Sequence, residues 1–218
     1  TNCPVFAMWF TDGVTRSRPK PAMCHNGAVT ETTKTPMLRS LEKSTLEIER
    51  HVATGGWDAP MRLFALAYAR RALDEHPELS DELPADVQAD AITDPTTLFS
   101  IEQEGLPEVD TIEELVTRIV WPDNVDGASL AVERIVLPPG SETQLPKDPK
   151  EAEAALEDHP ERQDVRIVVS VLRTGESWCA IRMKNFDDPT KVLSGENLVP
   201  GLVEGLRMGF SEEAWQSE

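Results

Sequence analysis

Cysteine is scarce in this 218-residue sequence, which has only Cys3, Cys24 and Cys179. An odd, sparse set excludes a disulfide framework, and no paired C-x-x-C motif is present to hold a structural zinc ion. The apolar stretch at residues 3–10 has no basic residue before it and no small-residue cleavage site after it, so we expect no signal peptide. The cysteines are expected to be free thiols in a reducing cytoplasm.

Long apolar runs and the short motifs of common enzyme classes are also missing. No stretch approaches the roughly 20 apolar residues that a membrane-spanning helix requires. Neither phosphate-binding glycine pattern occurs, and there is no G-x-S-x-G nucleophile motif. Cys179 falls inside a predicted strand, where it is expected to be a small buried hydrophobe. We therefore assign no catalytic residue, metal site or cofactor, and the sequence favours a protein that is not an enzyme.

Positive charge is in short supply: 21 Lys and Arg residues face 39 Asp and Glu residues, which gives a net charge of −18. Such a polyanion is repelled by nucleic acid and by anionic membranes, so neither is an expected partner. The charge is also uneven. Between Ala72 and Gly127 there are sixteen acidic residues and one basic residue, Arg118. This half is either a solvated, solubilising surface or a docking face for a basic protein.

The ends of the chain differ in composition from its middle. Residues 1–36 are rich in Thr, Pro, Ser and Arg and show no helical or strand period. We interpret them as a disordered leader or as the product of a start codon assigned too far upstream. Residues 37–210 are expected to form a single α+β domain, and residues 211–218 an acidic C-terminal tail.

Two helices are predicted after the leader. Thr35 and Pro36 suit the N-cap and first position of a helix that ends near Ala53. Its inward stripe recurs at helical spacing and consists of Leu41, Thr45, Ile48 and Val52. A second helix is predicted over 59–75, with Asp58 as its N-cap.

The stretch HVATGGWDAP (51–60) lies between these two predicted helices. Its GGWD segment is either a ligand-binding turn or the corner where one helix ends and the next begins. Two glycines at a corner need no further cause, so we favour the corner, with Trp57 folded onto the core.

Further helices are predicted near 84–92, from Ile112, over 150–158 and over 199–210. A short strand or buried loop is predicted at 97–101. The last helix carries Gly201, Gly205 and Gly209 on one face. That smooth face serves either close packing within the monomer or a homodimer contact.

Three strands are predicted at 129–137, 164–172 and 177–185. The last two flank a turn signal and form a hairpin. With Thr174-Gly175 as a two-residue loop, Val171 faces Trp178, Val169 faces Ala180 and Ile167 faces Arg182. The predicted fold class is thus α+β, with an N-terminal helical pair and further helices packed on a small antiparallel or mixed sheet of three to four strands.

Charged residues inside these apolar strands are the candidate ligand-binding site. They are Glu133, Arg134, Arg166 and Arg182, with Trp57 and Asp58 of the GGWD segment beside them. If one sheet face is a pocket, Arg134 and Arg182 would hold a carboxylate or phosphate group. The alternative is an ion pair between Glu133 and an arginine, or arginines that extend to solvent at the sheet edge.

A near-duplicate places two histidines beside carboxylates, in ALDEHPE (72–78) and ALEDHPE (155–161). Histidine and carboxylates are metal ligands and acid–base groups. Both stretches are also predicted to close a helix, where histidine suits the negative end of the dipole and proline stops propagation. We prefer this second explanation.

Four blocks in order carry a family resemblance: ERHVATGGWDAPMRLFAL, WPDNVDGASLAVERIVLPP, HPERQDVRIVVSVLRTGESWCAIRM and LVPGLVEGL. Across roughly residues 37–210 the chain resembles an actinobacteria-specific family of uncharacterised acidic proteins. The resemblance implies a stand-alone α+β domain in an actinobacterial cytoplasm. It carries over no catalytic residue, cofactor or partner.

Together these patterns favour an uncharacterised, cytoplasmic, acidic adaptor or regulatory domain that binds another protein. The alternative is a small-molecule binder, or an enzyme of unrecognised type, that holds an anionic ligand with the strand arginines. The two hypotheses differ in whether the charged strand residues converge on an enclosed pocket.

Overall fold

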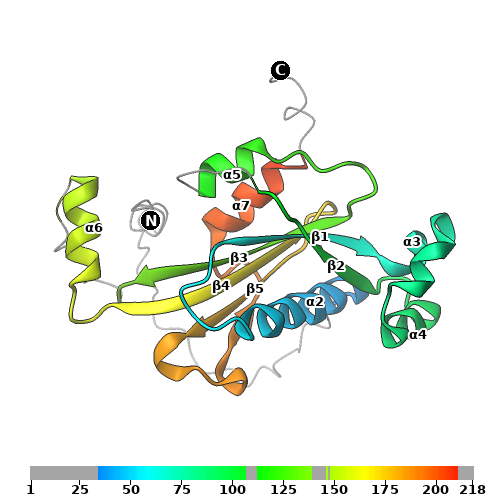
Figure 1. Cartoon of the computed structure of the whole chain (residues 1–218), viewed down its shortest axis with the longest axis horizontal. Helices are drawn as coiled ribbons and strands as arrows, with labels where there is room; N and C mark the ends of the chain where they lie inside the picture. Colours follow the sequence, from blue (N-terminus) through cyan, green and yellow to red (C-terminus); the bar gives the residue numbers. More distant parts are fainter. Residues whose placement is uncertain (1–33, 107–111, 139–145, 147, 211–218) are drawn as a thin grey trace, which may run out of the picture.

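The computed structural model describes residues 34–106, 112–138, 146 and 148–210, and within them the fold is α+β (Figure 1). Its centre is a six-stranded sheet in the order β2-β1-β3-β4-β5-β6, and every neighbouring pair is antiparallel. The strands are β1 (Arg62–Tyr68), β2 (Leu98–Glu102), β3 (Gly127–Val136), β4 (Gln163–Leu172), β5 (Ser177–Met183) and β6 (Leu193–Gly195). The predicted class is confirmed, but three to four strands was too few.

Helix α2 (Pro36–Ala53) covers one face of this sheet (Figure 1). The Thr35 hydroxyl accepts a hydrogen bond from the Leu38 N–H at 3.2 Å, as expected of an N-cap. The predicted inward stripe of Leu41, Thr45, Ile48 and Val52 is buried. Most of this stripe packs against Phe64, Leu66, Val168 and other residues of the sheet. The sequence prediction for this helix is confirmed.

The second predicted helix is wrong over its first half. Residues Arg62–Tyr68 form strand β1, which lies between β2 and β3, and only the remainder is helical, as α3 (Ala69–Glu75). Leu63 and Phe64 are buried on opposite faces of the sheet. A strand buried on both faces is a continuous apolar run, and its period does not distinguish it from a buried helix. The GGWD corner (residues 55–58) therefore joins a helix to a strand.

The β4–β5 hairpin is confirmed, but its register differs from the prediction by one residue. The loop has three residues, Arg173 to Gly175, because the Leu172 N–H donates to the Glu176 carbonyl at 2.9 Å. Gly175 adopts φ 108°, which glycine accepts readily. Val171 consequently faces Ser177, Val169 faces Cys179 and Ile167 faces Ile181. Since side chains alternate along a strand, the shift places Arg182 on the α2 face of the sheet beside its partner Arg166.

The opposite face is covered by α5 (Ile112–Arg118) and α7 (Pro200–Met208) (Figure 1). Helix α7 buries Leu202, Val203 and Leu206. Gly209, which follows α7, is buried, and a Cβ there would lie 3.1 Å from the Trp121 ring. One of the three positions predicted for a homodimer contact is thus already occupied within the chain, while Gly201 and Gly205 are half-buried.

Helical segments extend from both ends of the sheet (Figure 1). At one end lies the acidic lobe, residues 69–94, built from α3, the 3-10 helix η1 (Pro77–Asp81) and α4 (Ala85–Thr93). At the other end is α6 (Pro149–Glu157), and two short 3-10 turns, η3 (Lys184–Phe186) and η4 (Pro189–Lys191), follow β5. None of the helices described is long and apolar enough to cross a membrane. The predictions for residues 1–33 and 211–218 lie outside the described residues.

Candidate functional site

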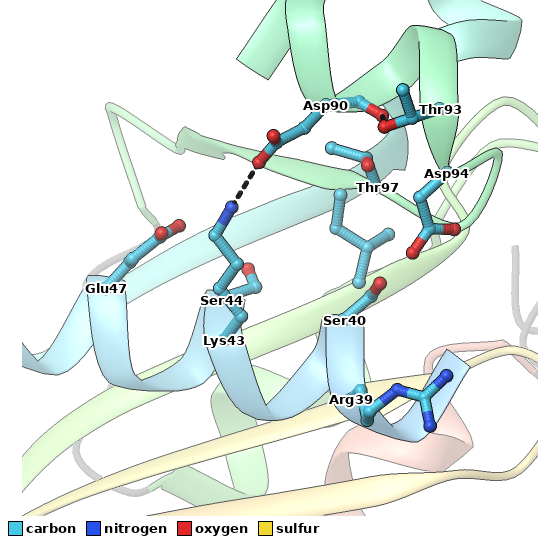
Figure 2. Close-up of a pocket in the computed structure, with 10 residues that line it drawn as sticks. Arg39, Ser40, Lys43, Ser44, Glu47, Asp90, Thr93, Asp94 and Thr97 are labelled. Atoms are coloured by element: carbon cyan, nitrogen blue, oxygen red, sulfur yellow. Dashed lines mark hydrogen bonds and ion pairs between the residues drawn. The ribbon is translucent and has the colours of Figure 1, made fainter. Parts of the chain in front are cut away.

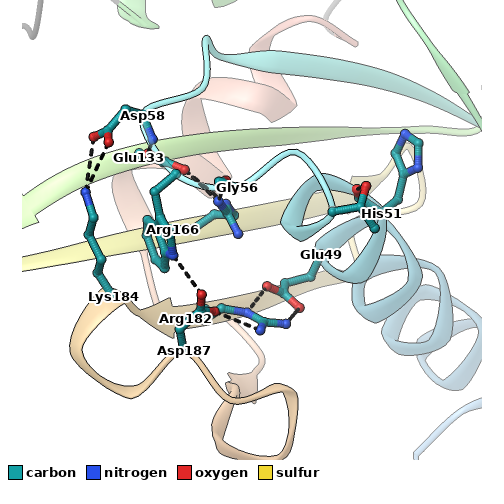
Figure 3. Close-up of polar contacts among 11 residues, drawn as sticks. Glu49, His51, Gly56, Asp58, Glu133, Arg166, Arg182, Lys184 and Asp187 are labelled. Carbon is teal, nitrogen blue, oxygen red and sulfur yellow. Dashed lines mark hydrogen bonds and ion pairs between the residues drawn. The ribbon is translucent and has the colours of Figure 1, made fainter.

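A polar cluster lies where α2, the GGWD corner, the middle strands and η3 meet (Figure 3). Glu133 of β3 is the cross-strand partner of Arg166 on β4, which is in turn the partner of Arg182 on β5. Cross-strand partners share a face, so all three side chains point to the side that α2 covers. The members of the polar cluster are Glu49, Trp57, Asp58, Glu133, Arg166, Arg182, Lys184 and Asp187.

Arg182 is bound by Glu49 from the inner face of α2. Its Nε and Nη2 donate to the two carboxylate oxygens at 2.6 and 2.7 Å, and the exposed fractions are 5% for Arg182 and 1% for Glu49. A third donor, Nη1, reaches Asp187 at 3.1 Å. The hydrogen bonds to Glu49 raise the pKa of the Arg182 guanidinium further above its ordinary value. This bidentate pair ties α2 to β5.

Arg166 ties the GGWD corner to the sheet. Its Nη2 donates to Glu133 at 2.8 Å and also to the carbonyl of Gly56, and its guanidinium lies 4.4 Å from the centre of the Trp57 ring. The second oxygen of Glu133 accepts the backbone N–H of Asp58 at 2.6 Å. Asp58 has a φ of 65°, an uncommon conformation for a residue with a side chain. Asp58 was predicted to cap a helix; it instead completes a turn that Glu133 holds.

Two contacts close the exposed side of the cluster. The Trp57 indole N–H donates to Asp187 at 3.0 Å, and the Lys184 ammonium lies 3.2 and 3.3 Å from the Asp58 carboxylate oxygens. The hydrogen bond from Trp57, followed by that from Arg182, lowers the pKa of Asp187 below its ordinary value. The corner and the segment after β5 are therefore joined to each other as well as to the sheet.

The cations of the cluster are paired internally. Three cations (Arg166, Arg182 and Lys184) face four carboxylates (Glu49, Asp58, Glu133 and Asp187), and each cation has a carboxylate partner. An incoming anion would compete with carboxylates that already neutralise these cations. The arrangement is suited to holding α2, the corner and three strands together, rather than to gripping a carboxylate or phosphate.

Arg134 is the one predicted site residue that the structure separates from the others. It neighbours Glu133 along β3, so its side chain lies on the opposite face of the sheet, and its Nη1 donates to the Glu133 carbonyl at 2.9 Å. The predicted clamp of Arg134 with Arg182 is therefore not formed. The other five predicted residues, Trp57, Asp58, Glu133, Arg166 and Arg182, are brought together.

Three members of the cluster were missed, namely Glu49, Lys184 and Asp187. A signal for Glu49 was available, because it follows Thr45 by four residues and so lies on the buried stripe of α2. A carboxylate at such a position requires a buried partner. Asp187 gives no comparable signal, since it lies in an irregular segment and is half exposed.

The chain was also compared with known proteins. The family model described as PPA1309-like protein matches residues 41–211. The chain belongs to this family. The match runs from α2 through α7 and contains the whole polar cluster and the acidic lobe. PPA1309-like proteins are an uncharacterised family. Searches of curated proteins and of solved structures gave no match.

A groove of about 260 Å³ lies apart from the polar cluster, between α2, the end of α4 and the start of β2 (Figure 2). It is lined by Arg39, Ser40, Lys43, Ser44, Glu47, Asp90, Thr93, Asp94, Thr97 and Leu98. None of the predicted site residues is among them. Lys43 contacts Asp90 at 2.6 Å, and this hydrogen bond raises the pKa of the lysine. With three carboxylates and two cations, the groove has a small negative balance.

The two histidines and the cysteine considered in the sequence lie at helix ends and in the core of the sheet. His76 ends α3 and His159 follows α6, as the helix-end explanation predicts. In the part of the chain that the structure describes, no group of three or more His, Cys, Asp or Glu residues is placed to hold a metal ion. Cys179 is fully buried in the sheet, and burial raises the pKa of its thiol.

Proposed function

We propose that this PPA1309-like protein is a non-catalytic adaptor or regulatory domain that binds a basic protein through its acidic lobe. The observation that carries the proposal is the segregation of charge. From Ala72 to Asp94 the lobe has eight carboxylates and no lysine or arginine, and the two arginines at its start, Arg70 and Arg71, bind the Ala91 carbonyl and Asp126. A surface of one sign attracts partners of the opposite sign and accelerates their association.

Four carboxylates of the lobe are available for such a partner. Asp74, Glu75, Asp81 and Glu82 are exposed, and within the described residues none of them contacts a lysine, arginine or histidine. The lobe also exposes 74% of Ile92. An apolar side chain among charges supplies the contact area that a purely electrostatic encounter lacks.

The test is a pull-down with the tagged protein and a variant in which Asp74→Asn, Glu75→Gln, Asp81→Asn and Glu82→Gln are combined. The matched control neutralises four exposed carboxylates elsewhere, with Glu151→Gln, Glu157→Gln, Asp158→Asn and Glu196→Gln. Both variants change the net charge equally, so only a surface-specific interaction distinguishes them.

We expect a partner, identified by mass spectrometry and basic by its sequence, that is retained by the wild type and by the control but lost from the lobe variant. Retention should fall when ionic strength rises from about 0.05 to 0.5 M, because exposed charges are then screened within a few ångströms. Equal recovery by both variants would contradict the role of the lobe. The absence of any salt-sensitive partner would contradict the function itself.

A further inference from the structure

Strand β2 is an edge of the sheet whose outer side has no partner among the described residues. Two hydrogen bonds show which residues of this segment point their backbone groups toward β1. The Gln103 N–H donates to the Leu63 carbonyl at 2.8 Å, and the Ala69 N–H donates to the Thr97 carbonyl at 2.9 Å. In an antiparallel pair, alternate residues direct both backbone groups to the same neighbour. Odd-numbered residues of β2 therefore face β1. The residues that direct N–H and C=O away from the sheet are Leu98, Ser100 and Glu102.

The edge is open to a partner. Ser100, Ile101 and Glu102 are exposed, and 51% of the Ile101 side chain is accessible. Edge strands are usually blunted by lysine, proline, a bulge or a very short length. The sequence of β2, LFSIE, contains no lysine or proline, and the strand pairs continuously with β1 over five residues. The opposite edge, β6, has only three residues.

The two faces of this edge differ in chemistry. Ser100 and Glu102 lie on the α2 face, because their partners Leu66 and Phe64 pack in the core beneath α2. The groove that begins at Leu98 lies on this side, and the carboxylates of Glu47, Asp90 and Asp94 outnumber its two cations, Arg39 and Lys43. Ile101 lies on the other face, opposite Ala65. A strand added here meets a groove of net negative charge on one face and an apolar side chain on the other.

From this placement we infer that β2 binds an extended segment of the basic partner as a seventh, antiparallel strand. Alternate residues of that segment are basic, facing the groove, and apolar, facing Ile101. The inference rests on the proposed function and specifies how the partner binds. Charge supplies the attraction, since residues 72–106 contain ten acidic and no Lys or Arg residues, while the backbone groups of β2 supply the register.

The probe is an eight-residue peptide of alternating lysine and valine, compared with a peptide of the same composition in which four lysines precede four valines. Nuclear magnetic resonance reports the exchange of individual amide protons. The alternating peptide is expected to slow exchange at Ser100 and Glu102 by about tenfold or more, because outward amides become hydrogen-bonded. Exchange at Ile101, whose N–H already faces β1, should not change. Equal protection by both peptides would overturn the inferred alternation of basic and apolar residues, and unchanged exchange at Ser100 and Glu102 with the alternating peptide would overturn strand addition itself.

Methylation of the peptide tests the pairing directly. Residues opposite Ser100 share its face and direct their N–H groups toward β2, so these are the lysines. N-methylation of the lysine amides is expected to weaken binding at least tenfold, while N-methylation of the valine amides leaves it within about twofold. The reverse order, or no difference, would overturn the inferred geometry.

A variant of the protein gives the complementary result. Ser100→Pro removes an outward N–H without breaking a bond to β1, a position where edge strands tolerate proline. It should weaken binding of the alternating peptide at least tenfold, whereas Ser100→Ala should change it less than twofold. If Ser100→Pro does not fold, the methylated peptides decide the question.

Failure of the inference and failure of the proposed function give different results. If the lobe variant loses the alternating peptide but Ser100→Pro and the lysine-methylated peptide bind normally, the acidic lobe binds basic segments without strand addition. If the lobe variant binds as tightly as the wild type, the proposed function is wrong.

Discussion

Glu49 and Arg182 are both almost completely buried, with 1% and 5% of their surfaces exposed. Removing one charge of such a pair leaves the other in a low-dielectric site without compensation. We predict that Glu49→Gln lowers the free energy of unfolding by about 3–5 kcal/mol, measured by urea denaturation. Glu47→Gln, an exposed position on the same helix, is the control and should change it by less than about 0.5 kcal/mol. Equal losses would show that the destabilisation is not specific to the buried pair.

Asp187 makes the polar cluster sensitive to acid. Its pKa is lowered in the folded protein, chiefly by the hydrogen bond from Trp57. Because its pKa is lowered on folding, this carboxylate stabilises the fold at pH values above its ordinary pKa, which is about 3.9. The contribution is lost as the pH falls through the lower pKa of the folded protein. We predict that the resonance of the Trp57 indole N–H shifts on acidification with a midpoint below the ordinary value. In Asp187→Asn this titration should vanish, and a midpoint at or above the ordinary value would contradict the assignment.

At the scale of elements, the start of β3 is packed against the end of β4 without space for a side chain. A Cβ at Gly127 would lie 2.5 Å from the Val171 carbonyl oxygen and 2.8 Å from Leu172 Cδ2. We predict that Gly127→Ala destabilises the protein by about 1–3 kcal/mol, because one of these contacts is with backbone and the strands must separate. Gly55→Ala, where the nearest atom is 3.5 Å away, is the control. Thermal denaturation that is equal for the two variants would refute the close approach.

The same elements show what local patterns could predict. Helix α2 and strands β3 to β5 were predicted because a capped stripe at helical spacing and long apolar runs beside a turn are local signals. Strand β1 was predicted as a helix because Leu63 to Leu66 are buried on both faces and carry no period of two. Strand β6 has three residues, too few for any pattern.

Only part of the polar cluster could be predicted, because the sequence shows local patterns and not contacts between distant residues. Glu133, Arg166 and Arg182 were recognisable as charges inside apolar strands. The predicted ion pair of Glu133 with an arginine is confirmed, with Arg166 as the partner. The partners that the sequence did not show are Glu49, 133 residues from Arg182, and the Gly56 carbonyl, 110 residues from Arg166. Such pairings depend on how α2 and the GGWD corner lie over the sheet. The one-residue error in the hairpin loop also affected the predicted site. It paired Arg182 with Ile167, whose side chain lies on the face opposite that of Arg166.

At the scale of the whole molecule, the net charge of −18 opposes folding through self-repulsion. We predict that about 0.5 M sodium chloride raises the thermal midpoint by several degrees, since repulsion among exposed carboxylates is screened while the buried pairs are not. Differential scanning calorimetry measures the change. The lobe variant with four neutralised carboxylates should respond less. A midpoint that falls with salt would show that exposed ion pairs outweigh the repulsion.

The open strand β2 also bears on how copies of this chain coexist in solution. Two such edges are complementary to each other, and their union would extend one continuous sheet across a dimer. Residues 72–106 of each copy contain ten acidic residues. A second copy of the chain is therefore repelled from this edge, whereas a cationic segment is attracted to it. The negative charge therefore determines which strands can pair with β2. Near the isoelectric point of 4.6 that discrimination fades, and light scattering should then detect self-association that is absent at neutral pH.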